Sequence, residues 1–179
     1  ALEKLPTEGL SEEALAGMPT EQQDTWRAIA AEFKKLLPEE GMPTCFPPGV
    51  VMASTWDPAL VSACAGAVAR EAKAFNVSMV LGPNLNIHRN PLGGRNFESY
   101  GEDPYLAGRI AVAYVQGMQA ERVAADVKHF AANNQETNRQ RVEERIPERA
   151  LREIYLPAFR AAVEEGGVWT VMSAYNKIN

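Results

Sequence analysis

The chain has 179 residues, of which 46% are hydrophobic and 23% are charged, and 23 acidic against 18 basic side chains give it a net charge of −5. This composition is typical of a globular protein with a buried core, and its acidic balance argues against nucleic acid or an acidic membrane as a partner. No apolar run reaches the roughly 18 residues of a membrane span. The first ten residues lack a signal-peptide pattern, so the sequence indicates no compartment.

Residues 1–42 are expected to form a helical segment of their own, to which we assign no function. Apolar side chains recur at helical spacing after Trp26 and predict a helix from about 20 to 37. Four prolines then crowd residues 38–48 and exclude a long helix there. We therefore expect a second domain over residues 43–179.

Expected strands and helices alternate along this second domain. Short apolar, β-branched or mixed runs predict strands at about 49–54, 77–81, 123–130 and 168–175. An aspartate followed by a proline starts a helix well, because the carboxylate accepts free amide hydrogens of the first turn and proline has none to lose. Helix starts are accordingly expected at Asp57-Pro58 and Asp103-Pro104, and a third helix is expected to open at Pro147-Glu148, with helix ends near 75, 120 and 165.

The long polar loops, at 82–101 and 131–146, follow expected strands, whereas the turns after helices, at 119–122 and 165–167, are short. In a (β/α) barrel the loops after the strands build the active site. This distribution favours a barrel over a doubly wound sheet. A complete eight-stranded barrel takes around 250 residues, so the expected fold is α/β, a partial (β/α)8 barrel of the TIM type with about four strands and connecting helices. Such a part leaves bare sheet edges.

Lys128 and His129 end one expected strand, where a barrel enzyme keeps its functional side chains. Neighbouring strand residues point to opposite faces. Both side chains can therefore serve one pocket only if the backbone leaves regular strand geometry, and we expect an irregular, strained peptide near 128–130. The alternative is that Lys128 caps the sheet and His129 is a hydrogen-bonded core histidine.

The loop at 84–100 carries Arg95, whose guanidinium can offer forked hydrogen bonds to vicinal hydroxyls. The alternative for Arg95 is a structural ion pair with Glu98. The glycine spacing in this loop excludes a phosphate loop. His88 and His129 would form a metal site only with acidic partners, and we expect no metal.

Met172 and Tyr175 close the last expected strand. A flexible apolar side chain beside an aromatic hydroxyl suits the mixed polar and apolar faces of a sugar, although a core Met and a buried Tyr would look the same. Composition and spacing alone thus predict part of a barrel-type enzyme that binds a small polyol-like ligand.

Four segments resemble, in the same order, the family 3 glycoside hydrolases and in particular their β-glucosidase branch. They are PTCFPPGVVMASTWDPALV (43–61), GPNLNIHRNPLGGRNFESYGEDPYLAG (82–108), VKHFAANNQETNR (127–139) and VMSAYNKIN (171–179). The resemblance implies a first subsite that holds a terminal, non-reducing β-D-glucosyl residue. It assigns the grip on the sugar hydroxyls to Arg95, Lys128, His129, Met172 and Tyr175. The implied reaction is retaining hydrolysis through two carboxyl groups, without a cofactor.

The sequence departs from the family pattern at the catalytic carboxylates. The nucleophilic aspartate of the family stands in a Ser-Asp-Trp type motif beyond the equivalent of Asn179, and the acid/base comes from a following α/β domain. A sugar-binding DGP-like motif is not found upstream of Pro43. We therefore expect no catalytic residue in this chain, which alone should be inactive. Asp126, two residues before Lys128, is not proposed as a substitute nucleophile.

The expected partners are a glucoside or oligosaccharide substrate, the rest of the barrel and a C-terminal α/β domain. A non-catalytic half-barrel scaffold or sugar-binding fragment is the main alternative. A third hypothesis makes Lys128 the Schiff-base lysine of an aldolase-like lyase. The sequence indicates neither the aglycone nor the oligomeric state.

Overall fold

A computed structural model describes residues 16–36 and 43–179. The chain divides into two compact units, Ala1–Pro43 with Ala74–Asn76 and Thr44–Lys73 with Val77–Asn179. In the first unit, α2 (Thr20–Leu36) confirms the helix expected from residue 20. Residues 16–36 are the described part of the expected segment 1–42. The remaining residues of that segment lie outside the described ranges.

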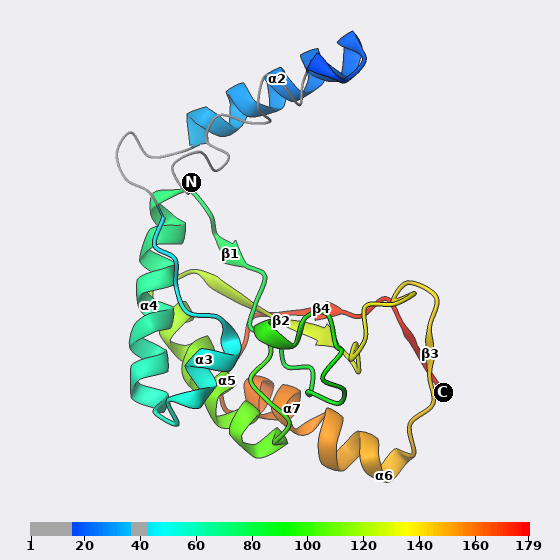
Figure 1. The fold of residues 1–179 in the computed structure, drawn as a ribbon. Coiled ribbons are helices and arrows are strands. Elements are labelled where there is room, and N and C mark those ends of the chain that lie inside the picture. The colour runs from blue at the N-terminus through cyan, green and yellow to red at the C-terminus, as the bar shows by residue number, and fades with distance from the viewer. Residues whose placement is uncertain (1–15, 37–42) are drawn as a thin grey trace. The chain divides into compact units, whose positions relative to one another are not determined.

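Three parallel strands form the sheet of the second unit, in the order β1–β2–β4 (Figure 1). They are β1 (Met79–Val80), β2 (Ala124–Phe130) and β4 (Thr170–Ser173). Met79 pairs with Ala124, and Val127 pairs with Val171. Three of the four expected strands and their parallel arrangement are thus confirmed.

The helices α4 (Pro58–Ala74), α5 (Pro104–Ala120) and α7 (Pro157–Glu164) lie on one side of these strands (Figure 1). The first two begin as expected. Asp57 Oδ1 accepts hydrogen bonds from the amides of Ala59 and Leu60 at 2.9 and 3.1 Å. Asp103 Oδ1 accepts one from the Tyr105 amide at 2.9 Å. Each carboxylate therefore satisfies amides that the helix itself leaves free.

The third expected helix, 148–165, is interrupted. It divides into α6 (Glu148–Ala150), a π-helical stretch η2 (Leu151–Tyr155) and α7. Pro157 has no amide hydrogen to donate and crowds the preceding turn. The helix widens there into a π turn, in which the Leu156 amide donates to Leu151 O, five residues earlier, at 3.0 Å.

The strand expected at 49–54 is wrong, because this segment forms the helix α3 (Gly49–Ser54). The β-branched pair Val50-Val51 suggested a strand. Instead, Pro48 stands extended before the helix and its carbonyl accepts from the Met52 amide at 3.1 Å. Met52 and Ala53 pack into the core, and this burial outweighs the weak local preference for strand.

A second, two-stranded parallel sheet was not expected. It joins β3 (Glu143–Glu144) to β5 (Lys177–Ile178). Asn179 Oδ1 also accepts from the Ile146 amide at 2.9 Å. This small sheet attaches the end of the loop that follows β2 to the segment that follows β4, so both loops lie at the same end of the main sheet.

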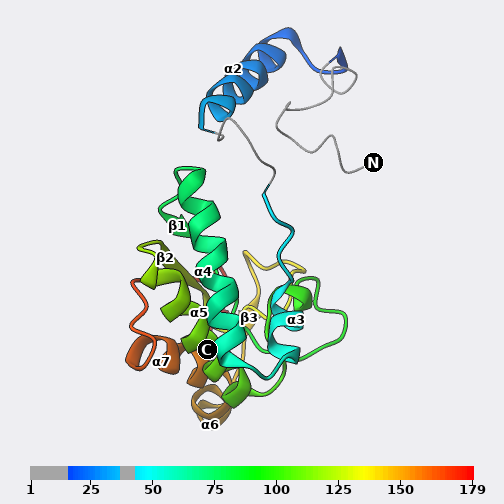
Figure 2. The ribbon, with the colours of Figure 1, turned by 90° about the vertical axis from the view of Figure 1, so that its left-hand side faces the viewer.

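The apolar core lies between the main sheet and its helices. Val61 of α4, Ile110 and Met118 of α5, and Val127 of β2 are fully buried in it. Figure 2 shows α4 and α5 side by side. No described strand pairs with the outer side of β4. The sheet therefore has the bare edge expected of part of a barrel.

Candidate functional site

The carboxyl end of β2 departs from regular strand geometry, as expected. Its pairing with β4 shifts between Val127 and Phe130, and the Lys128–His129 and Phe130–Ala131 peptide bonds are cis. The side chains of Lys128 and His129 both reach one polar cluster, although neighbours in a regular strand point to opposite faces.

The loop before α5 brings Arg95 and Glu98 to the same place. The short 3-10 helix η1 (Asn96–Glu98) sets Glu98 beside Arg95, whose Nε donates a hydrogen bond to Glu98 Oε2. Lys128 Nζ lies 3.5 Å from Glu98 Oε1, and Arg95 Nη1 lies 3.1 Å from His129 Nε2. Three of the five predicted site residues thus meet in one cluster, in which Arg95 and Lys128 pair with Glu98 and His129 contacts Arg95.

The loop after β2 contributes a second carboxylate, Glu136. Its Oε1 lies 3.8 Å from Arg95 Nη1, and its Oε2 accepts from Arg139 Nη1 at 3.0 Å. The guanidinium of Arg139 lies 5.6 Å from the ring centre of Tyr175. Tyr175 is therefore joined to the rim of the cluster, and with 66% of its surface exposed it is not a buried core tyrosine.

Met172 lies half-buried in the middle of β4. Its neighbour Val171 pairs with the core residue Val127, so Met172 points to the opposite face of the sheet. No hydrogen bond or ring contact among the described residues joins Met172 to the polar cluster. Its role in a sugar site stays a prediction.

Burial and the positive charges of Arg95 and Lys128 lower the pKa of His129 from 6.5 to about 4. The imidazole is therefore neutral at physiological pH. Asn86 contacts the ring from the other side, with its Oδ1 3.1 Å from His129 Nδ1.

The two cations also act on Glu98. Partial burial would raise the pKa of its carboxyl group, but the hydrogen bond from Arg95 and the charges of Lys128 and Arg95 outweigh burial and lower it. The same hydrogen bond raises the pKa of Arg95. The cluster therefore presents fixed cationic donors beside an ionised acceptor.

The folded state should lose stability in acid because of His129. Its folded pKa of about 4 lies below its ordinary 6.5, so the unfolded chain takes up the proton first. The stabilisation is complete above pH 6.5 and falls by on the order of 3 kcal/mol as the pH drops to about 4.

Urea denaturation between these pH values checks this expectation against the non-titrating variant His129→Gln. Carboxylates titrate in both proteins and cancel in the difference. Equal slopes of unfolding free energy against pH in the two proteins would contradict the assignment.

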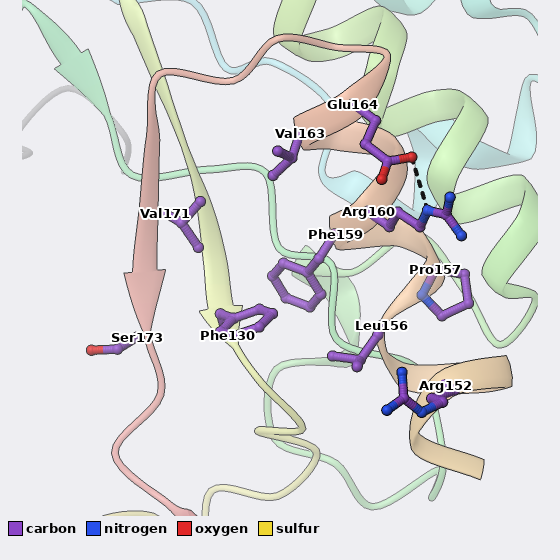
Figure 3. A pocket seen from close by; sticks show the side chains of 10 residues that line it. All are labelled: Phe130, Arg152, Leu156, Pro157, Phe159, Arg160, Val163, Glu164, Val171 and Ser173. Carbon is purple, nitrogen blue, oxygen red and sulfur yellow. Dashed lines mark hydrogen bonds and ion pairs between the residues drawn. The ribbon is translucent and has the colours of Figure 1, made fainter. Parts of the chain in front are cut away.

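A hollow of about 270 Å³ adjoins the cluster. Lys128 and Glu98 stand on its wall, with Phe46 and Phe97 as apolar surface. A larger groove, of about 840 Å³, runs between β4 and α7 (Figure 3). It contains none of the cluster residues and is lined mainly by apolar side chains, so we place the site at the smaller hollow.

Two residues of the cluster, Asn86 and Glu136, were not singled out from the sequence. Glu136 could have been found from the sequence, because it is an acidic residue in the polar loop that follows β2. Asn86 lies in a run where polar Asn84, Asn86 and His88 alternate with buried Leu85 and Ile87. That alternation places Asn86 on one side of the chain but does not reveal its contact with His129.

The two histidines do not come together. His88 Nε2 lies 2.6 Å from Asn96 O, whereas His129 faces Asn86 and Arg95. Over residues 16–36 and 43–179, no group of three or more His, Cys, Asp or Glu side chains could hold a metal ion. Within the same ranges, no helix is long and apolar enough to cross a membrane.

Comparison with known proteins connects this geometry to a family. The model of the glycosyl hydrolase family 3 N-terminal domain matches residues 35–179. An exo-α-(1→6)-L-arabinopyranosidase of Bifidobacterium longum is 53% identical over 136 residues, which are 76% of this chain and 18% of that protein. A β-glucosidase of Bacteroides ovatus is 50% identical over 135 residues, 75% of this chain and 18% of the relative.

Solved structures agree with the fold. A β-glucosidase from Kluyveromyces marxianus superposes with a TM-score of 0.76 at 47% identity, over 80% of this chain and 16% of its own. β-Glucosidase 3B from Thermotoga neapolitana, in complex with α-D-glucose, gives 0.75 at 48% identity, over 80% and 21%. These likenesses confirm the partial α/β barrel. The chain spans less than a fifth of the first relatives' length, and it belongs to glycosyl hydrolase family 3, as part of the N-terminal domain.

Proposed function

We propose that this chain supplies the glucose-binding side of the first subsite of a retaining β-glucosidase, which hydrolyses terminal non-reducing β-D-glucosyl residues. One observation carries the proposal. Arg95 and Lys128 both pair with Glu98 at the carboxyl end of the sheet, and His129 joins the same cluster through its contact with Arg95. This is the end at which barrel enzymes bind their substrates.

The cluster has the chemistry that a sugar ring requires. A hydroxyl group both donates and accepts hydrogen bonds, and the cluster offers charged donors on Arg95 and Lys128 beside a carboxylate acceptor. Hydrogen bonds to charged groups contribute about 1.5 to 3 kcal/mol each. Tyr175 on the rim would give the apolar face of the ring an aromatic surface, and Met172 would give it a flexible one.

The carboxylates of the cluster are engaged as partners of cations. Glu98 is bound by Arg95 and Lys128, and Glu136 by Arg139. Asp126 is buried within β2 and only 6% exposed. We therefore place the nucleophile and the acid/base in parts of the protein beyond these 179 residues.

The proposed chemistry is a double displacement. An aspartate attacks the anomeric carbon while a second carboxyl group protonates the departing oxygen, and water then releases the sugar from the covalent intermediate. The residues of this chain would hold the glucosyl hydroxyls throughout both steps. Lys128 has a task in this scheme as an ion-paired donor, and family membership argues against the Schiff-base lyase.

We propose that the groove beside β4 is filled by the rest of the barrel. Phe130 and Val171 of the sheet face Val163 of α7 across it, and all three are about half exposed (Figure 3). The bare edge of β4 lies alongside. A further strand pairing with β4, with its helix packed into the groove, would bury these apolar surfaces.

The direct test is release of p-nitrophenol from its β-D-glucoside. The 179-residue chain is expected to give no release above the uncatalysed rate. A chain extended through the next strand and the following α/β domain is expected to hydrolyse the glucoside. Turnover by the 179-residue chain that Asp126→Ala abolishes would overturn the placement of the nucleophile. An extended chain that binds glucose without hydrolysing glucosides would favour a sugar-binding role.

A second candidate substrate is an α-L-arabinopyranoside, because one relative at 53% identity carries that activity in its name. An arabinopyranosyl ring has no hydroxymethyl group, so it makes fewer contacts than a glucosyl ring. Comparing kcat/KM of the extended chain for the two p-nitrophenyl glycosides distinguishes the candidates. A ratio above about 10 in either direction, roughly 1.4 kcal/mol, identifies the preferred sugar.

A further inference from the structure

Asn86 makes two hydrogen bonds to the backbone of His129. Its side-chain Oδ1 accepts from the His129 amide at 3.0 Å, and its Nδ2 donates to the His129 carbonyl at 3.0 Å. A backbone N–H can only donate and a carbonyl oxygen can only accept. These two bonds therefore fix which end of the Asn86 carboxamide is oxygen and which is nitrogen.

The orientation of Asn86 in turn fixes the proton on the imidazole. Asn86 Oδ1 lies 3.1 Å from His129 Nδ1 and can only accept, so Nδ1 carries the hydrogen. In the neutral ring Nε2 is then an acceptor. It faces Nη1 of Arg95 at 3.1 Å, which can only donate. Every donor in this chain of contacts meets an acceptor.

The segment that carries Asn86 is attached firmly to β2. The Leu85 amide donates to Lys128 O at 2.7 Å, and Lys128 N donates to Pro83 O at 3.0 Å. Asn84 Oδ1 accepts from the Asn86 amide at 3.0 Å. Asn86 itself is only 5% exposed. Its carboxamide is thus held in place before any ligand binds.

The charged groups around His129 favour the neutral ring. Among the charges, those of Arg95 and Lys128 lower the pKa of His129 most, Glu98 opposes them, and Arg139 adds a third positive charge. Glu136 is engaged with Arg95 and Arg139. A protonated ring would place a second donor against the Arg95 guanidinium and remove that hydrogen bond.

We propose that Asn86 is a positioning residue, which holds His129 as the Nδ1–H tautomer and so keeps Nε2 as the acceptor that orients Arg95. A sugar hydroxyl that reached Nε2 would have to donate its hydrogen to it. This inference rests on the proposed function for its consequence in catalysis, but the tautomer can be measured without any substrate.

Long-range ¹H–¹⁵N NMR of the imidazole nitrogens tests the tautomer in the 179-residue chain. The sequence has only two histidines, so two ring systems are observed and His88→Gln assigns them. The expected spectrum at neutral pH shows His129 with protonated Nδ1 and unprotonated Nε2. A wild-type His129 with the hydrogen on Nε2 would overturn the proposal even if no variant could be purified.

The variant Asn86→Asp keeps the acceptor at Nδ1 and adds a negative charge to it, while it loses the donor to the His129 carbonyl. It is expected to raise the pKa of His129 by about one to three units, since a carboxylate stabilises the imidazolium. Asn90→Asp is the matched control, because it adds the same charge to a nearby exposed position, where the side chain accepts from the Leu92 amide and does not contact His129. Equal pKa values of His129 in both variants would overturn the proposal.

Kinetics of the extended chain separate this inference from the proposed function. In Asn86→Asp the acidic limb of kcat/KM for the β-glucoside is expected to move upward by the same interval as the pKa of His129. A limb that stays in place while the pKa moves would overturn the link to the sugar site. An extended wild-type chain with no glycosidase activity would defeat the proposed function and leave the NMR result standing.

Discussion

Replacing Arg95 with alanine in the extended chain is expected to lower kcat/KM for a β-glucoside by about 100-fold or more. The proposed role gives Arg95 charged hydrogen bonds to sugar hydroxyls. Its removal also leaves Glu98 with Lys128 as its remaining cation and deprives Nε2 of His129 of its donor. Arg95→Lys should recover little, because lysine lacks the planar fork of donors.

The matched control is Arg70→Ala. Arg70 also forms an ion pair with a glutamate, Nη1 to Glu121 Oε1 at 2.7 Å, but on the exposed surface between α4 and the end of α5. Such surface pairs contribute about 0 to 1 kcal/mol. Its kcat/KM should stay within twofold of wild type. Arg95→Ala with activity equally close to wild type would show that its pair with Glu98 is only structural.

The sequence predicted the helices best where a local signal starts them. At Asp57 and Asp103 the carboxylate and the following proline act within one turn, so no distant part of the chain is needed. Pro157 is equally local, and its effect on the third helix could have been expected. The segment 49–54 failed for a different reason. Its two valines favour a strand only weakly, and the packing of Met52 into the core decides the outcome.

The site was predictable in part because strand ends carry function in barrels. That rule located Lys128 and His129, and the irregular backbone needed to bring both to one cluster follows from the period of a strand. Asn86 and Glu136 were harder to find. Asn86 contacts His129, which lies 43 residues later in the sequence, and Glu136 contacts Arg95, which lies about 40 residues earlier. Composition and spacing along the sequence do not indicate such long-range contacts.

The crossing of α4 and α5 gives the largest expected effect on stability. A β-carbon at Gly117 would lie 2.2 Å from the backbone oxygen of Ser62, far inside contact distance, and backbone cannot move aside as a flexible side chain can. Gly117→Ala must therefore push the two helices apart and disturb the core around Val61 and Met118. We expect a loss of about 3 kcal/mol in the free energy of unfolding.

Gly66→Ala at the same crossing is the matched control, with the opposite sign expected. A β-carbon there would lie 3.4 Å from Arg70 Nη1 and 3.6 Å from Gly117 O, which are ordinary contacts. Alanine in a helix interior should then stabilise the protein by roughly 0.5 to 1 kcal/mol through its helix propensity. Urea denaturation followed by circular dichroism measures both. Destabilisation of the two variants by equal amounts would mean that loss of glycine itself, and not the contact with Ser62, sets the cost.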